Sequence, residues 1–198
     1  MKLFASMTSP YARKVRMVAL EKRLPMDVID VQAADPRVAE RNPMAKVPVL
    51  ERDDGSTLFD SVVIVQYLDS LAAPALIPIA GEARWRALRW EALGDGIMDA
   101  VITRLLEKRR PAEQQSADAL KHQEGKVARC LEFAEREIGE VPWLVENRIT
   151  IADIALATAL SYVDLRYPHD WRRDYPRLTQ WLATFSARSS FVETESPR

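Results

Sequence analysis

The fold is decided by residues 1–22, which read MKLFASMTSPYARKVRMVALEK. They begin with a short apolar strand at residues 2–6 and pass through a polar turn into residues 11–22. Apolar side chains recur in this last segment at helical spacing, and Pro10 stands where a first-turn proline is well tolerated, so a helix is predicted. Ser9 then lies at or beside the N-cap of that helix.

Ser9 has an ordinary interpretation and a functional one. An N-cap serine accepts a hydrogen bond from an N–H group of the first turn, and most serines in this position do no more. The positive end of the helix dipole and the unpaired N–H groups also converge there, which would stabilise a thiolate. Ser9 is not itself a thiol, but its hydroxyl can donate a hydrogen bond to one. Which interpretation holds depends on what the chain places nearby.

Composition excludes several classes of function. The chain has 198 residues and a net charge of -1, which argues against nucleic acid and anionic membranes as partners. A single cysteine, Cys130, rules out an internal disulfide and a cysteine-based zinc site, and the distant His122 and His169 do not favour a metal centre. The N-terminal apolar run ends at Ser6, too early for a signal peptide, and no run approaches the ~20 residues that span a bilayer. A cytoplasmic location is therefore expected.

Residues 1–73 predict an α/β domain. The expected order of elements is β-α-β-α-β-β-α, in which the first two strands are parallel and a hairpin adds antiparallel strands. After the elements already described, strands are predicted at residues 26–31, 47–51 and 57–59, and helices at residues 35–42 and 60–71.

A proline-containing linker at residues 74–81 precedes a second domain at residues 82–198, in which every periodic segment has helical spacing. Gly94 and Gly96 are expected to mark a kink or a close approach of the backbone. Helices are predicted at residues 82–109, 112–138, 151–166 and 176–189.

The third of these helices has the clearest local signature. Residues 150–153, Thr-Ile-Ala-Asp, have the form of a capping box in which Asp153 replaces the usual Glu. The residues that follow are apolar on nearly every side, so this helix is expected to be central and buried. Asp153 is therefore assigned a structural role.

Two further places in the first domain are candidate sites. Pro48 is ordinarily a trans proline at a sheet edge, whereas a cis bond would turn the N–H and C=O of Val47 outward for pairing with an extended peptide. Asp60 and Ser61 ordinarily cap a helix, but they could also hold a carboxylate and an ammonium group. Lys46 is either a solvated charge or the partner of a second carboxylate. Together these residues describe a site for a small zwitterionic peptide.

The chain resembles the cytosolic glutathione transferases over nearly its whole length, and most closely the bacterial YibF-like branch with a Ser-Pro-Tyr/Phe turn. The resemblance implies a thioredoxin-like N-terminal domain, an all-helical C-terminal domain and a homodimer. The matching segments are residues 9–16 (SPYARKVR), 42–50 (NPMAKVPVL), 58–61 (LFDS) and 150–155 (TIADIA).

The resemblance also implies roles around bound glutathione. Val47, preceding a cis Pro48, would pair with the cysteinyl backbone. Asp60 and Ser61 would hold the γ-glutamyl end, and Lys46 the glycyl end.

Ser9 would be the catalytic residue that hydrogen-bonds the glutathione sulfur. Omega-like and glutaredoxin-like relatives carry a cysteine where this chain has Ser9. Serine forms no mixed disulfide, so conjugation or binding is favoured over thiol–disulfide exchange.

The predicted function is a glutathione S-transferase that needs no metal. Ser9 and the helix N-terminus would favour the thiolate of the co-substrate glutathione, which attacks a small hydrophobic electrophile between the domains. A non-catalytic stress or regulatory binding protein is one alternative. A glutathione-dependent peroxidase, isomerase or dehalogenase, sharing the same glutathione site, is another.

Overall fold

The computed structural model describes residues 1–32, 34–140, 142–167 and 170–197, so His169 lies outside the described residues. The chain divides into two compact units, Met1–Ile79 with Arg188–Arg198, and Ala80–Ala187. Within the described residues, no helix has the length and apolar character needed to cross a membrane.

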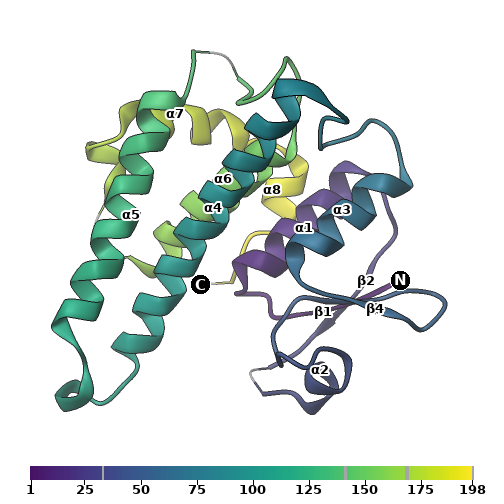
Figure 1. The fold of residues 1–198 in the computed structure, drawn as a ribbon, viewed down its shortest axis with the longest axis horizontal. Helices are drawn as coiled ribbons and strands as arrows, with labels where there is room; N and C mark the ends of the chain where they lie inside the picture. The colour runs from purple at the N-terminus through teal and green to yellow at the C-terminus, as the bar shows by residue number, and fades with distance from the viewer. Residues whose placement is uncertain (33, 141, 168–169, 198) are drawn as a thin grey trace. The chain divides into compact units, whose positions relative to one another are not determined.

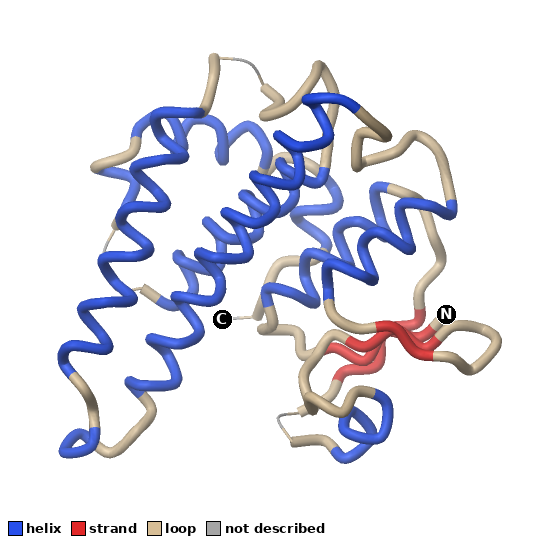
Figure 2. The backbone as a smooth tube through the Cα atoms, viewed as in Figure 1, coloured by secondary structure: helices blue, strands red, loops and turns tan. Residues whose placement is uncertain are grey.

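The first unit contains a four-stranded sheet (Figures 1 and 2). Its strands lie in the order β2-β1-β3-β4. β1 pairs in parallel with β2 and antiparallel with β3, and β4 is antiparallel to β3, which confirms the predicted thioredoxin-like arrangement. The strands are β1 (Lys2–Ala5), β2 (Asp27–Asp30), β3 (Val49–Glu51) and β4 (Thr57–Leu58).

Helices cover both faces of this sheet. α1 and α3 lie side by side on one face, and α2 lies on the other (Figure 1). Under α2, Phe4, Val38 and Val49 are buried in one apolar cluster, which joins the sheet to that helix. The helices of this unit are α1 (Pro10–Glu21), α2 (Pro36–Arg41), α3 (Ser61–Leu71) and α8 (Ser189–Glu193).

A buried ion pair ties the end of α1 to α3 and to the chain that follows it. The Lys22 ammonium donates to a carboxylate oxygen of Asp69 at 2.9 Å and to the carbonyl of Pro74 at 2.7 Å. The Asp69 carboxylate also accepts from the N–H groups of Leu76 at 2.6 Å and Ile77 at 3.0 Å. Part of the predicted linker at residues 74–81 is therefore bound to the first unit.

The second unit is helical, as predicted. The last predicted helix, at residues 176–189, is interrupted: α7 ends at Phe185, and α8 belongs to the first unit. The predicted helical domain at residues 82–198 thus differs from the structure at its C-terminal end. The helices are α4 (Gly81–Lys108), α5 (Ala117–Glu137), α6 (Ile151–Arg166) and α7 (Pro176–Phe185), with 3-10 turns at Ala112–Gln114 and Trp171–Arg173.

α6 is the centre of this second unit, since every residue of its first ten is buried. A Cβ atom added to Gly94 of α4 would lie 2.8 Å from the carbonyl oxygen of Ala155, so the predicted close approach is confirmed at Gly94. Gly96 has nothing within 4 Å of such an atom. Glycine at position 94 is what allows α4 and α6 to pack so closely.

The capping box at the start of α6 is also confirmed. Asp153 is fully buried, and one of its carboxylate oxygens accepts from the Thr150 N–H at 2.8 Å and hydroxyl at 2.9 Å. The other oxygen accepts from the Leu144 N–H at 2.9 Å. Asp153 therefore joins the preceding loop to the helix, which agrees with a structural role.

Candidate functional site

Three segments carry the candidate site residues: the turn that contains Ser9, the loop at residues 46–48, and residues 60–61. All three lie at the same edge of the sheet. The strand register pairs Phe4, near the end of β1, with Val49, at the start of β3. It also pairs Leu50 of β3 with Leu58 at the end of β4. The turn after β1, the residues before β3 and the residues after β4 consequently meet at the same edge.

Ser9 is the N-cap of α1. Its backbone is extended, with φ -78° and ψ 121°, and its hydroxyl oxygen accepts from the Ala12 N–H at 3.3 Å. The Ser9 N–H donates to the Ser6 carbonyl at 2.9 Å, and Pro10 has no N–H to offer. The capping interpretation is therefore correct. Because capping uses an oxygen lone pair, this bond does not consume the hydroxyl hydrogen, which a serine can donate to an anion.

The loop before β3 is shaped by Asn42. This side chain is 1% exposed, its amide nitrogen donates to the Lys46 carbonyl at 2.8 Å, and its amide oxygen accepts from the Met44 N–H at 3.0 Å. Together these two bonds fix the turn that presents Lys46 and Val47. Asn42 has no predicted role, although an asparagine side chain that accepts from the N–H two residues further on is a recognised turn signal.

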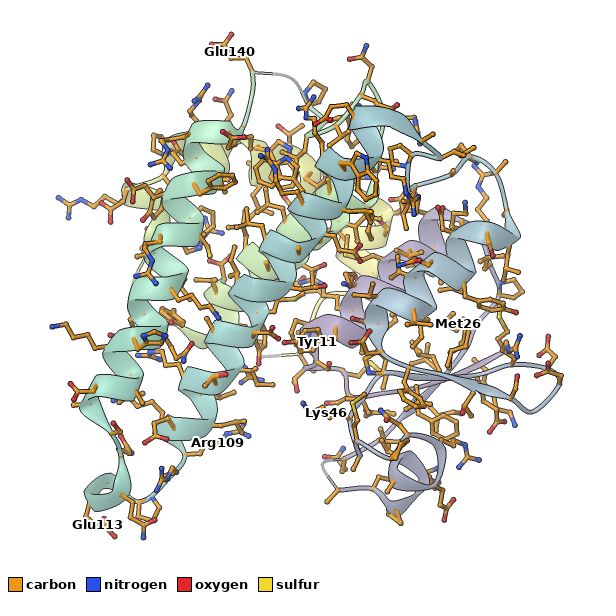
Figure 3. The ribbon with its side chains drawn as sticks, viewed as in Figure 1. Tyr11, Met26, Lys46, Arg109, Glu113 and Glu140 are labelled. Carbon is orange, nitrogen blue, oxygen red and sulfur yellow. The ribbon has the colours of Figure 1, made fainter. Side chains whose placement is uncertain are left out.

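The rest of that loop carries two of the predicted site residues. Lys46 is exposed, and Val47 is partly buried against the apolar cluster under α2. The peptide between Val47 and Pro48 is cis. Figure 3 shows Lys46 in this loop and Tyr11 in the first turn of α1.

Asp60 and Ser61 lie at the start of α3. Asp60 is the N-cap, and its carboxylate accepts from the Val62 N–H at 3.1 Å, so the ordinary interpretation is correct here too. Ser61 is the first residue of the helix and is 3% exposed. The site edge is therefore bordered by the N-terminal ends of two helices, each carrying a partial positive charge that favours anions.

Metal ligands do not gather in the described part of the chain: no group of three or more His, Cys, Asp or Glu side chains there could hold an ion. Cys130, in α5, is half-buried, and burial raises the pKa of its thiol, with Lys126 and Arg129 acting in the opposite sense. A raised pKa is the reverse of what a reactive cysteine needs.

Comparison with known proteins identifies the family. The model of the glutathione S-transferase N-terminal domain matches residues 3–75, and that of the C-terminal domain matches residues 114–184. The chain is 38% identical to an uncharacterized GST-like protein, YibF, of Escherichia coli K12, over 100% of both chains. The chain belongs to the glutathione S-transferase family.

Solved structures of glutathione S-transferases are similar over the whole fold. One from Methylobacillus flagellatus KT, with GSH bound, is 42% identical over 99% of each chain, with a TM-score of 0.95. Another, from Methylobacterium radiotolerans JCM 2831 in complex with glutathione sulfonate, is 34% identical over 100% of this chain and 95% of that one, with a TM-score of 0.94. The resemblance noted in the sequence is thereby confirmed.

Proposed function

We propose that this member of the glutathione S-transferase family binds glutathione at the edge formed by Ser9, the loop before β3 and the start of α3, and conjugates it to a small hydrophobic electrophile. One observation carries the proposal: these segments leave the sheet together, with Ser9 capping α1. The relatives solved with GSH and with glutathione sulfonate support glutathione as the ligand.

Each segment offers a group that suits one part of the tripeptide. The backbone of Val47 pairs with the cysteinyl residue as a short added strand. The N-terminus of α3 and the Ser61 hydroxyl take the γ-glutamyl carboxylate, and Asp60 takes the adjacent ammonium group. Lys46, on the exposed loop fixed by Asn42, takes the glycyl carboxylate.

Ser9 carries the chemistry. Its hydroxyl donates a hydrogen bond to the sulfur, and the positive end of α1 adds to the stabilisation of the thiolate. Each unit by which the thiol pKa falls corresponds to about 1.4 kcal/mol in favour of the thiolate. The thiol proton passes to solvent, and the thiolate donates a sulfur lone pair to the electrophilic carbon to form a C–S bond. In an aryl halide the halide then departs with its bonding electrons; in an activated alkene the π electrons move to the neighbouring carbon, which takes up a proton from water. No disulfide exchange is open to Ser9, because it has no sulfur.

The test compares Ser9→Ala with Ser70→Ala, which removes an exposed hydroxyl of α3 that donates to the Tyr67 carbonyl at 2.7 Å. Initial rates are measured over a panel of aryl halides and activated alkenes, and affinity is measured by titration with glutathione. We expect Ser9→Ala to lower kcat/KM by roughly 100-fold, as for the loss of one donor to a developing anion, and to change the Kd little. Ser70→Ala should match the wild type.

The other outcomes of the same experiment are also informative. Unchanged kinetics in Ser9→Ala would remove Ser9 from the mechanism. No binding at millimolar glutathione would favour a non-catalytic binding protein. Binding without conjugation, but with turnover of peroxides or haloacids, would favour a glutathione-dependent peroxidase or dehalogenase. The expected homodimer stays a prediction that light scattering can measure.

A further inference from the structure

The C-terminal segment of the chain packs along α1. Residues 188–194 include α8, a helix of five residues that belongs to the first unit. So short a helix is unstable alone, because too few hydrogen bonds offset the cost of ordering its backbone. Side chains of α1 meet both ends of α8, in an arrangement that compensates for its length.

Two arginines of α1 satisfy carbonyl groups at the C-terminal end of α8. Arg13 donates to the Phe191 carbonyl at 3.0 Å and to the Thr194 hydroxyl at 3.3 Å, and its guanidinium lies 4.3 Å from the centre of the Phe191 ring. Arg16 donates to the carbonyls of Glu193 at 3.3 Å and Thr194 at 3.5 Å. The last carbonyls of a helix have no partner within it and favour cations, so these contacts cap α8.

The other end of the segment is held by Glu21, at the end of α1. Its carboxylate accepts from the Arg188 guanidinium at 2.9 and 2.7 Å and from the Ser190 hydroxyl at 2.5 Å. Burial alone would raise the pKa of Glu21, but the hydrogen bonds from Arg188 and Ser190 outweigh it and hold the pKa below its ordinary value. α1 therefore presents a carboxylate to the start of α8 and two guanidinium groups to its end.

Arg13 links this contact to the candidate site. Its backbone N–H donates to the carbonyl of Ser9 at 3.0 Å, which closes the first turn of α1. Its side chain is 2% exposed and reaches the C-terminal segment. One residue thus ties the turn that begins at Ser9 to residues 191 and 194.

We propose that residues 188–194 act as a clasp that fixes the first turn of α1, and that Arg13 is the positioning residue through which the clasp orients Ser9. The inference rests on the proposed function of Ser9. Its physical basis is the steep distance and angle dependence of a hydrogen bond to a thiolate. If the first turn relaxes, the Ser9 hydroxyl and the helix end move away from the position that the sulfur occupies.

Two substitutions loosen the clasp without touching glutathione. Arg13→Lys keeps the charge but loses the planar fork that reaches both Phe191 and Thr194. Thr194→Val keeps the shape of the side chain and removes the hydroxyl that accepts from Arg13. The matched control is Arg129→Lys, which makes the same change at an exposed arginine of α5.

The decisive readout is the thiol pKa of bound glutathione, followed by the ultraviolet absorbance of the thiolate as pH is raised. We expect Arg13→Lys and Thr194→Val to raise that pKa by about 0.5 to 1 unit, a three- to tenfold loss of thiolate at pH values below it. kcat should fall in proportion, while the Kd for glutathione changes less than about twofold. Arg129→Lys should show no shift.

Ser9→Ala is titrated in the same series to separate the two proposals. If Ser9→Ala raises the thiol pKa and both clasp variants bind glutathione with the wild-type pKa, the clasp has no positioning role, even if the variants unfold more easily. If Ser9→Ala itself leaves the pKa unchanged, the proposed function fails and the inference fails with it. Should Arg13→Lys not fold, Thr194→Val decides the question alone.

Discussion

Removal of the Asp153 carboxylate gives the clearest stability prediction. Asp153→Ala leaves the buried N–H groups of Leu144 and Thr150 without their acceptor at any pH. At about 2 kcal/mol for each unsatisfied group, the loss is about 4 kcal/mol. This loss in the free energy of unfolding applies at low pH, where the wild-type carboxyl group is neutral and no buried charge destabilises the wild type.

The loss should shrink as pH rises. Burial raises the pKa of Asp153 from 3.8 to about 6, against the opposing hydrogen bonds from Leu144 and Thr150. Between those two values the folded protein holds a proton that the unfolded chain has released, so rising pH lowers the stability of the wild type. The full difference, about 2 units, corresponds to roughly 3 kcal/mol. The deficit of Asp153→Ala should therefore fall from about 4 kcal/mol near pH 4 to about 1 kcal/mol at pH 7.

Urea unfolding at pH 4, 5, 6 and 7 measures this directly, because titrations common to both proteins cancel in the difference. Glu140→Ala removes an exposed carboxylate from the loop that precedes Leu144 and should differ little from the wild type at any pH. A deficit that is constant with pH, or that grows toward pH 7, would contradict the raised pKa of Asp153.

Three other substitutions test packing inside the units, one in the first unit and two in the second. Lys22→Met leaves the Asp69 carboxylate buried without its ammonium partner and should cost about 3 to 5 kcal/mol in urea unfolding; a cost under about 1 kcal/mol would mean that the pair is not buried in solution. Gly94→Ala forces a Cβ atom to within 2.8 Å of the Ala155 carbonyl oxygen and should cost about 1 to 3 kcal/mol. Gly96→Ala, with nothing within 4 Å, should be neutral or stabilising by up to about 1 kcal/mol, and equal effects at the two glycines would refute the close approach.

The elements of the fold were predictable where the information is local. Pro10 at the first turn of a helix and the capping box that ends at Asp153 each mark a helix start within a few residues. α8 could not be predicted in this way, because the residues that hold it are 169 to 181 positions away along the chain: Arg13 and Glu21 of α1 meet its two ends. Helical periodicity therefore predicted one continuous helix at residues 176–189, whereas the structure has α7 and a separate α8 that contacts α1.

In the candidate site too, the local roles of residues were predictable and the long-range ones were not. Ser9 and Asp60 have capping roles that follow from residue type and position, and both are observed. Asn42 was missed as a positioning residue, since its importance lies in a bond to the Lys46 carbonyl that only the folded loop reveals. Arg13 was missed for the same reason: one arginine in a basic helix has no local mark of burial.

The thiol pKa of glutathione bound to the wild type and to Ser9→Ala is the measurement that tests the central claim. If Ser9 stabilises the thiolate, the wild-type complex should titrate below free glutathione, and Ser9→Ala should return the pKa toward the free value by at least about one unit. A bound thiol that titrates like free glutathione, or one whose lowered pKa is the same in both proteins, would contradict the account.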